Sequence, residues 1–380
     1  MLAVKSNRKP QLYYITKKYE LPLPYFLSIV TVVAAGITLS GLAVLHLSNR
    51  VPAVIPLPFT TSLKQRQEKL ELIYNVRTPP KFRYSSDLQA IVDDIVNLAI
   101  RKGLPTESLS ISLIDITNPK TPKSAVYQDQ ELRFPASVSK LFWLVALYAQ
   151  FERRTIKNEA SLSSDIYKMV QKSDNNAASR IIDQLTQTTS GGTLEDEAYG
   201  IWQRKRKSLN RFFQEAGYAN INISQKNFPI PYQKLELPEG RDLQMRGAPS
   251  HLIRNKITSY HAARLMYEIF TEQAVSSQAS QEMKRLLTRD LRPEVWQKEQ
   301  YNSIKGFLGE LLPINNVYFA SKVGWTTSSR QDVAYIESKD GRARYILVIF
   351  GDHPAYAEDW DIFPEMSLLV FNRIVEQGVK

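Results

Sequence analysis

Apolar residues recur with helical spacing at the start of the region that we predict to fold. Within residues 87–103 they fall every three or four positions, at Leu88, Ile91, Val92, Ile95, Leu98 and Ala99. This spacing puts them on one helix face, and Gly103 stands where a helix C-cap would. Residues 109–116 alternate with period two and predict a strand, and a second strand is predicted near residues 125–128. The helix is therefore followed by a predicted hairpin.

A second hairpin and a last helix are predicted near the C-terminus. VAYIES at residues 333–338 and RYILVIFGD at residues 344–352 are strand candidates, and a KDG turn lies between them. In residues 364–377 one helix face carries Met366, Leu369, Val370 and Ile374. Strands thus occur at both ends of the region, with helical segments between them. This order predicts an α/β fold (an α+β sandwich) in which both ends of the domain form one antiparallel sheet beside a helical lobe.

The N-terminal part contains a predicted membrane span. No charged residue occurs in residues 21–49, and residues 25–47 are mostly Leu, Ile, Val and Ala. A helix needs about 20 apolar residues to cross the hydrocarbon layer of a bilayer. A cleaved signal peptide is the alternative, but its apolar region would be only about 7–15 residues long. We therefore predict an uncleaved transmembrane anchor.

The flanks of this span predict its orientation and the division of the chain. Only Glu20 opposes the basic residues before the span, which favours a cytoplasmic N-terminus; they are Lys5, Arg8, Lys9, Lys17 and Lys18. The residues just after the span are rich in Pro, Ser and Thr, as an extended tether would be. We predict a cytoplasmic basic tail (1–24), a transmembrane anchor (25–47), a Pro-rich tether (48–80) and an extracytoplasmic folded domain (81–380).

Composition narrows the classes of partner. The 380 residues carry a formal net charge of +11, but the basic residues are scattered and no recognised nucleic-acid motif accompanies them. We therefore expect no nucleic-acid partner. A basic surface without a specific partner and contact with anionic lipid headgroups or cell-wall polymers both stay open. Four histidines and no cysteine argue against a structural zinc site, and no metal or cofactor is expected.

The motif SVSK at residues 137–140 predicts an activated serine. Ser137 opens an apolar helical segment, and Lys140 lies about one turn later, so both side chains share a face. A serine hydroxyl needs a base, and a lysine amine can be that base only when burial or a nearby cation lowers its pKa. The N–H groups at the helix start could also stabilise an oxyanion. An isolated motif of this kind is more often a serine N-cap followed by an exposed lysine.

A second motif, SDN at residues 173–175, precedes another helical stretch. The Ser173 hydroxyl could pass a proton between Lys140 and a leaving nitrogen. Asn175 could hydrogen-bond both Lys140 and a substrate amide, while Asp174 stabilises the loop. Alone, the motif would equally suit an ordinary helix N-cap.

A third motif, KVG at residues 322–324, leads into a predicted strand. Lys322 could present its ammonium group to a substrate carboxylate, and Gly324 would allow close approach of the backbone. The N–H group of Trp325 would be a second oxyanion donor beside that of Ser137. Alone, these residues would suit a turn before a strand.

Taken together and in this order, the motifs resemble those of the serine β-lactamase and penicillin-binding-protein superfamily, and especially its class A β-lactamase-like members. FPASVSK and SDNNAASRIIDQL are the most specific pieces, and the resemblance covers residues 87–377. It implies an acyl-enzyme on Ser137, assisted by Lys140 and Ser173. It also implies that β-lactams or peptidoglycan stem peptides bind on the periplasmic side of a bacterial cytoplasmic membrane, through Asn175, Lys322, Gly324, Trp325 and Thr326.

Two departures from the family pattern affect the expected activity. Val323 replaces a hydroxyl residue of the third motif, so Thr326, Thr327 or Arg330 would have to compensate in carboxylate recognition. The glutamate that activates the deacylating water in class A β-lactamases is missing where we expect it, and Glu236 and Glu239 are the nearest candidates. The departures favour slow, peptidase-like deacylation.

Two classes of function remain open on the sequence alone. The first is a membrane-anchored serine hydrolase, with β-lactam hydrolysis and D-Ala-D-Ala peptidase chemistry as variants of one acyl-enzyme. The second is a catalytically weak or inactive cell-wall binding or scaffold protein that keeps the fold. The survival of all the main polar groups, which a scaffold would not need, favours the enzyme.

Overall fold

The computed structural model describes residues 74–156, 159–299 and 302–377. These residues belong to one compact unit, Phe59–Lys380. Within them no helix is both long and apolar enough to cross a bilayer. The predicted tail and anchor, and most of the predicted tether, lie outside the described residues.

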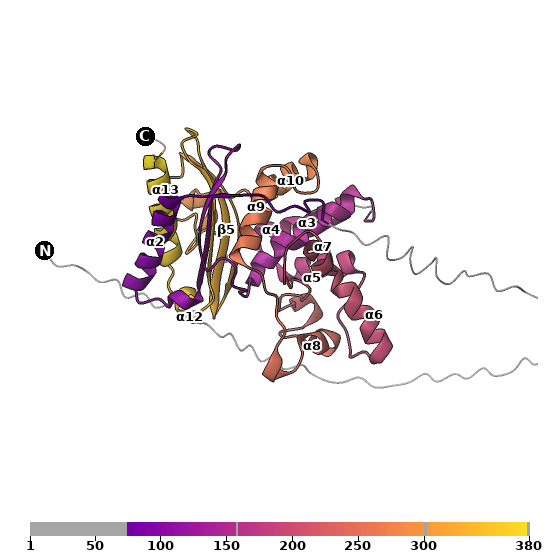
Figure 1. Ribbon diagram of the computed structural model, residues 1–380. Helices are drawn as coiled ribbons and strands as arrows, with labels where there is room; N and C mark the ends of the chain where they lie inside the picture. The colour runs from indigo at the N-terminus through magenta and orange to yellow at the C-terminus, as the bar shows by residue number, and fades with distance from the viewer. Residues whose placement is uncertain (1–73, 157–158, 300–301, 378–380) are drawn as a thin grey trace, which may run out of the picture. The chain divides into compact units, whose positions relative to one another are not determined.

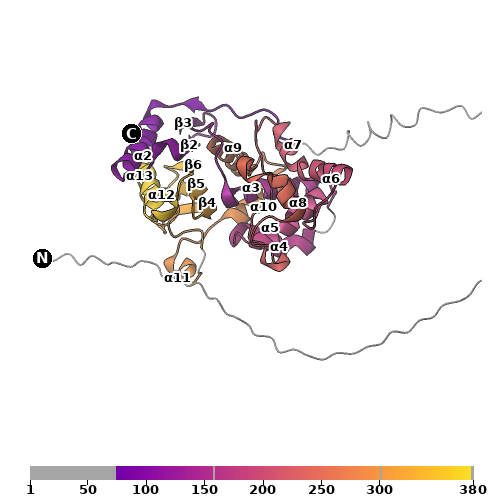
Figure 2. The same ribbon diagram turned by 90° about the horizontal axis from the view of Figure 1, so that it is seen from below.

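One six-stranded sheet runs through the described part, in the order β1-β3-β2-β6-β5-β4 (Figure 2). All neighbouring strands are antiparallel except β1 and β3, which pair in parallel over two residues. Both predicted hairpins are confirmed, and the short parallel strand β1 is an addition to the antiparallel sheet predicted. The strands are β1 (Arg83–Tyr84), β2 (Leu109–Asp115), β3 (Lys123–Tyr127), β4 (Val317–Thr326), β5 (Ser329–Ser338) and β6 (Arg344–Gly351).

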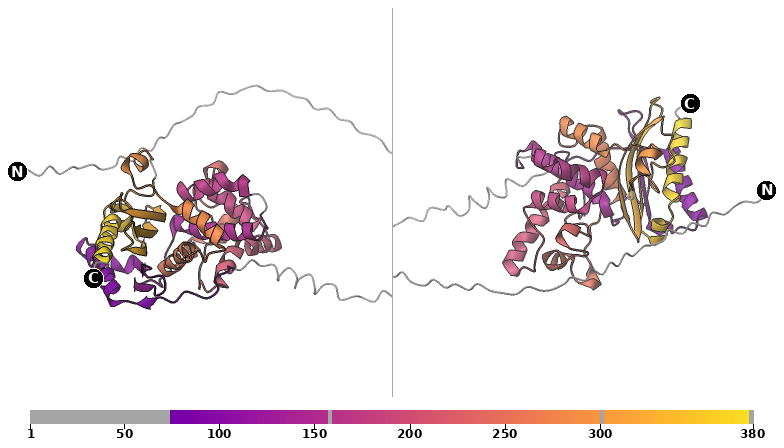
Figure 3. Two further views of the ribbon diagram at one scale, coloured as in Figure 1. Left: turned by 90° about the horizontal axis from the view of Figure 1, so that it is seen from above. Right: turned by 180° about the vertical axis from the view of Figure 1, so that it is seen from behind.

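Helices cover both faces of this sheet (Figures 1 and 3). The predicted first and last helices, α2 (Ser86–Arg101) and α13 (Ile362–Gln377), pack together on one face, beside α12 (Pro354–Glu358). The helical lobe lies on the other face, which α9 (Ser259–Phe270) contacts directly. The remaining helices are α3 (Ser139–Glu152), α4 (Glu159–Gln171), α5 (Asn175–Thr186), α6 (Asp196–Arg206), α7 (Ser208–Gln214), α8 (Gly240–Arg246), α10 (Ser277–Leu287) and α11 (Pro293–Trp296).

Strand alternation explains how the sheet separates two hydrophobic cores. On β6, Ile346 and Val348 belong to the core shared with the helical lobe, whereas Leu347 and Ile349 belong to the core under α2 and α13. Successive side chains of a strand point to opposite faces, so a strand buried on both faces must be apolar throughout. This is why β6 is a continuous apolar run rather than an alternating one.

Helix α3 is the central helix of the lobe. Its residues from Ser139 to Ala149 are all buried, so the helix has no polar face, as expected of a helix surrounded by protein. The indole N–H of Trp143 donates a hydrogen bond to the Ile223 carbonyl at 2.8 Å, which satisfies the polar atom in this core. The helix therefore gives a rigid support to the residues at its N-terminus.

The folded body begins before the predicted domain boundary at residue 81. Tyr74 is fully buried in the core of the helical lobe. Its hydroxyl donates to Glu268 at 2.8 Å, and the same carboxylate accepts from Tyr218 and Arg264. Residues 74–80, which we predicted to be part of the tether, therefore belong to the folded domain. Sequence gave no sign of this because the partners of Tyr74 lie far along the chain.

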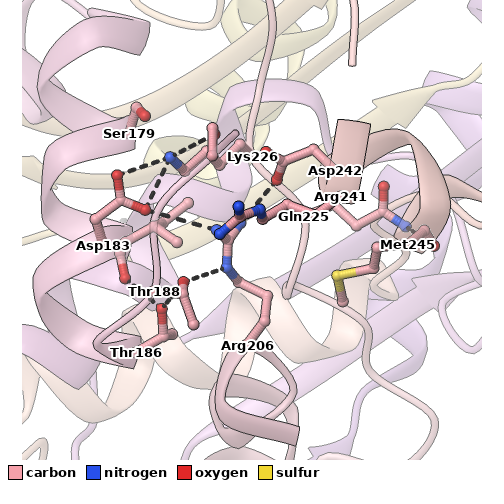
Figure 4. A network of polar contacts seen from close by, with 12 residues as sticks. Ser179, Asp183, Thr186, Thr188, Arg206, Gln225, Lys226, Arg241, Asp242 and Met245 are labelled. Carbon is pink, nitrogen blue, oxygen red and sulfur yellow. Dashed lines mark hydrogen bonds and ion pairs between the residues drawn. The ribbon is translucent and has the colours of Figure 1, made fainter. Parts of the chain in front are cut away.

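A buried network of ion pairs ties the segment around Lys226 to the helical lobe (Figure 4). The Lys226 ammonium lies 2.8 Å from the carboxylate of Asp183 on α5. Arg206 on α6 lies 3.5 Å from Asp183 and 3.2 Å from Asp242 on α8. Both cationic side chains are fully buried, so each depends on these carboxylates for compensation of its charge.

We predict that Asp183→Asn lowers the free energy of unfolding by about 3–5 kcal/mol, because it leaves Lys226 and Arg206 buried without a shared counter-charge. Urea denaturation measures this change. Glu282→Gln is the control, because Glu282 pairs with Arg285 on the surface of α10, where the side chains are 46% and 69% exposed. Such a pair contributes at most about 1 kcal/mol. Equal effects of the two substitutions would contradict a structural role for the network.

Candidate active site

Ser137 lies in a short 3-10 turn, Ala136–Val138, directly before α3. We expected Ser137 itself to open the helix, and this was wrong: α3 begins at Ser139. Ala136 has a φ of 45°, in the left-handed region, so the backbone turns sharply just before the serine. The Ser139 hydroxyl donates to the Ala136 carbonyl at 2.8 Å and closes this turn.

The Lys140 amine is the centre of the cluster that the sequence predicted. It is fully buried and lies 2.8 Å from Ser137 Oγ, 2.5 Å from the Ser173 carbonyl and 2.7 Å from Asn175 Oδ1. Burial lowers the pKa of Lys140 to about 7, although the Asp174 carboxylate opposes the shift. A substantial fraction of this amine is therefore neutral near neutral pH.

The partners of Lys140 are of two kinds, groups that can only accept a hydrogen bond and hydroxyl groups. A neutral amine has two N–H groups and one lone pair, and the carbonyl of Ser173 and the side-chain oxygen of Asn175 can only accept. These two acceptors take both N–H groups. Two hydroxyl oxygens also lie beside the amine, Ser137 Oγ at 2.8 Å and Ser173 Oγ at 3.4 Å. When the amine is neutral, its lone pair can accept a proton from the nearer of the two, Ser137 Oγ.

The second motif supplies these acceptors through the start of α5. Asp174 is the N-cap of α5, and its carboxylate accepts a hydrogen bond from the N–H of Ala177 at 2.6 Å. Ser173, just before the cap, has a φ of 54°, which turns its carbonyl to Lys140. The expected loop-stabilising role of Asp174 is consistent with this geometry.

Lys322 approaches the same cluster from strand β4. Its amine donates to Ser173 Oγ at 2.9 Å and to the Val323 carbonyl at 2.8 Å, and the side chain is fully buried. Burial lowers the pKa of Lys322 well below its usual range, and the positive charges of Lys140 and Arg289 lower it further. The Ser173 hydroxyl therefore lies between two amines, that of Lys322 and that of Lys140 at 3.4 Å.

Strand alternation places every second residue of β4 on the side of the nucleophile. Ala320 lies in the lobe-side core and Phe319 in the opposite core, so Lys322, Gly324 and Thr326 share the face of Ala320. A Cβ atom on Gly324 would lie 2.5 Å from the Pro135 carbonyl oxygen and 2.9 Å from Ser137 N. Only glycine lets the strand approach the serine turn this closely.

Two side-chain amides that the sequence analysis did not identify donate hydrogen bonds to the backbone around this turn. The Asn227 side chain donates to the Ala136 carbonyl at 3.2 Å and to Ser139 Oγ at 3.3 Å. The Gln331 side chain donates to the Phe134 carbonyl at 2.8 Å. Asn227 directly follows Lys226, so the ion network of Figure 4 fixes the segment that contacts the turn. The register of β5 could have indicated Gln331, since it lies opposite Gly324.

Arg289 is a further residue that the motifs did not reveal. Its guanidinium donates to the carbonyls of Val170 and Gln171, near the end of α4, and to that of Ser321 on β4. The side chain is largely buried beside Lys322, and burial lowers the pKa of Arg289 to about 10. It joins the strand of Lys322 to the lobe and adds positive charge to the cluster.

Several candidates do not join the cluster. Arg330 lies on the opposite side of the sheet, where its guanidinium is buried against the carbonyls of Gly306, Tyr356 and Ala357, so it cannot compensate for Val323. Glu236 and Glu239 are exposed, and neither has a hydrogen bond to the cluster among the described residues. Thr326 differs from these residues, because it is on the same face of β4 as Lys322; its hydroxyl lies 3.0 Å from that of Ser329.

Comparison with known proteins agrees with this fold. Residues 155–374, more than half of the chain, match the model of the β-lactamase enzyme family. That range contains Ser173, Asn175 and Lys322 and begins after the SVSK motif. No curated protein sequence matches the chain.

Solved structures share the fold at low sequence identity. A β-lactamase from Sphaerobacter thermophilus has a TM-score of 0.52 and 14% identity, covering 76% of this chain and 97% of that protein. A protein called PBP-A has a TM-score of 0.51 and 18% identity, covering 78% and 98%. A mutant of PBP-A, determined as an acyl-enzyme complex with penicillin G, matches with a TM-score of 0.51 at 18% identity, covering 77% and 98%.

The family match spans the second and third motifs, and the fold places the first motif against both. On these grounds the chain belongs to the β-lactamase enzyme family, within the superfamily of serine β-lactamases and penicillin-binding proteins.

Proposed function

We propose that this protein is a serine hydrolase whose Ser137 forms an acyl-enzyme with β-lactams or with D-Ala-D-Ala-type stem peptides of peptidoglycan. One observation carries the proposal: the buried Lys140 amine lies 2.8 Å from Ser137 Oγ and has acceptor-only partners for its two N–H groups. A purely structural role does not explain why the Lys140 amine is buried, partly neutral and next to a serine hydroxyl.

In the proposed acylation step, each proton transfer is assigned to a named residue. Lys140 takes the proton of Ser137 as the serine oxygen bonds to the substrate carbonyl carbon. The N–H groups of Ser137 and Trp325 are the proposed donors to the oxyanion. The proton passes through Ser173 Oγ to the amide nitrogen as its bond to the carbonyl carbon breaks. Lys322 binds the substrate carboxylate, and the Thr326 hydroxyl substitutes for the one that Val323 lacks.

Deacylation is proposed to be slow. The segment that contacts the serine turn presents an amide, Asn227, rather than a carboxylate. Among the described residues, the carboxylate whose charge acts on Lys140 is that of Asp174, which already caps α5. A water molecule attacking the acyl-enzyme therefore lacks a dedicated carboxylate base, and peptidase-like behaviour is favoured over rapid β-lactam hydrolysis.

The proposed location follows from the sequence. Residues 25–47 anchor the protein in the bacterial cytoplasmic membrane, and the catalytic domain lies on the periplasmic side, where stem peptides are found. The net charge of +11 would favour contact with anionic cell-wall polymers there.

We predict that a fluorescent penicillin labels the wild-type protein covalently and that Ser137→Ala abolishes the label, because the acyl bond forms on that oxygen. Gel fluorescence after denaturation measures it. The label should persist for many minutes after excess probe is removed. Failure of the folded wild type to label at high probe concentration would contradict the proposal and favour the scaffold alternative, whereas loss of the label within seconds would contradict slow deacylation.

The rate constant of penicillin acylation should rise with pH and level off above an apparent pKa near 7. The rise occurs because the pKa of Lys140 is lowered to about 7, so the amine loses its proton in that range. Since Lys322 shares the cluster, the midpoint belongs to the coupled pair. Stopped-flow measurements between about pH 5 and pH 9 test this. A rate that is flat through neutral pH and rises only as a normal lysine titrates, near 10.5, would refute the base assignment.

Gly324→Ala should lower the acylation rate about tenfold or more, because the added Cβ must displace the turn that carries Ser137. The secondary structure measured by circular dichroism should stay native. Gly192→Ala is the matched control, since a Cβ at Gly192 meets nothing within 4 Å. If Gly324→Ala acylates as fast as the control, the contact between β4 and the serine turn has no catalytic importance.

A further inference from the structure

Two half-exposed tryptophans lie beside the proposed oxyanion site. Trp325 directly follows Gly324 on β4 and is 43% exposed, and Trp360, between α12 and α13, is 40% exposed. Their ring centroids are 5.9 Å apart, with 43° between the ring planes. We call this pair the tryptophan platform. Exposed apolar side chains that gather in a contiguous patch mark candidate binding sites, whereas single ones are common on protein surfaces.

The platform is fixed in place before any ligand binds. The Trp325 indole donates to the Ala357 carbonyl at 3.2 Å. The guanidinium of Arg330 lies 4.1 Å from the centre of the Trp360 ring, and three carbonyls hold that guanidinium. A Cβ on Gly306 would come within 2.3 Å of Trp360, so the ring packs directly on the backbone. Rigid aromatic planes reduce the entropy that binding costs.

Charge around the platform narrows the class of ligand. Glu358, Asp359 and Asp361 flank Trp360, and the nearby Lys102 ammonium is already paired with Glu365 at 2.8 Å. This acidic surround disfavours anionic lipid headgroups and phosphates. The Arg330 guanidinium behind the Trp360 ring disfavours a cation on its outer face. A neutral ring with apolar C–H faces and hydroxyl groups fits both constraints, since the exposed carboxylates of Glu358 and Asp361 can accept hydrogen bonds from its hydroxyl groups.

The position of β4 links the platform to the catalytic cluster. β4 is the edge strand of the sheet, and Trp325 lies on the face opposite Lys322. A single strand therefore separates the platform from the serine side. A ligand that lies along this edge reaches both faces, with its carbonyl group near Ser137 and a further group on the tryptophans.

We propose that the tryptophan platform binds a sugar ring of the peptidoglycan glycan, so that the preferred substrate is a stem peptide still attached to its sugars. This rests on the proposed function for the chemistry at Ser137. The platform itself is a separate site, since neither indole contacts Lys140, Ser173 or Lys322 among the described residues.

The test compares a disaccharide pentapeptide with the same pentapeptide lacking sugar, using the full-length protein. Trp360→Leu removes the aromatic plane but keeps apolar contact with Gly306 and Arg330. It should raise KM for the sugar-bearing substrate about tenfold and leave KM for the free peptide and the penicillin acylation rate unchanged. Trp360→Phe should restore most of the difference. Tyr84→Ala, which removes an aromatic residue 65% exposed on β1 at the other edge of the sheet, is the control and should behave as wild type.

A binding measurement separates failure of the platform from failure of the proposed chemistry. The trimer of N-acetylglucosamine should bind Ser137→Ala protein, detected by tryptophan fluorescence, and should bind at least tenfold more weakly when Trp360→Leu is added. Binding of the trimer without penicillin labelling of the wild type would support the platform and overturn the hydrolase proposal. Equal affinities for the trimer with and without Trp360 would overturn the sugar site. A fluorescence change that reflects only a change in the oligomeric state of the protein would also overturn it.

Discussion

Two lysine amines, buried side by side around one serine hydroxyl, are the constraint on which the site depends. Lys140 and Lys322 both contact Ser173 Oγ, at 3.4 and 2.9 Å, and neither side chain is exposed. Two buried like charges repel each other and lose their hydration, so the protein favours states in which an amine is neutral. The nitrogen of a neutral amine has a lone pair, and this lone pair can take a proton from a neighbouring hydroxyl group. In this way burial keeps part of the Lys140 population neutral beside Ser137, which is what the proposed function requires of it.

Rigid elements hold the three groups at this separation. Ser137 lies in the turn just before α3 and Lys140 at the buried start of α3. Ser173 precedes the cap of α5, and Lys322 projects from an edge strand. Gly324 lets that strand touch the serine turn, while Asn227 and Gln331 hold the turn from other directions. Sites supported in this manner keep their geometry without relying on mobile loops.

The same arrangement explains what sequence could and could not predict. Local periodicity identified the helices and hairpins at both ends of the domain, and the order of the motifs identified Ser137, Lys140, Ser173 and Lys322 as one cluster. Sequence could not tell on which face of the sheet Arg330 lies, because the answer depends on strand register. Tyr74, Asn227 and Arg289 were missed because each bonds to groups distant in sequence, and no local pattern records such contacts.

The most direct test of this account is the pKa of Lys140 itself. NMR titration of the protein with isotope-labelled lysine side chains, with the signal assigned by Lys140→Arg, reports the protonation of the amine without any substrate. The account predicts a midpoint near 7. A Lys140 amine that stays protonated up to its ordinary value of 10.5 would contradict it, because no neutral base would then face Ser137 under physiological conditions.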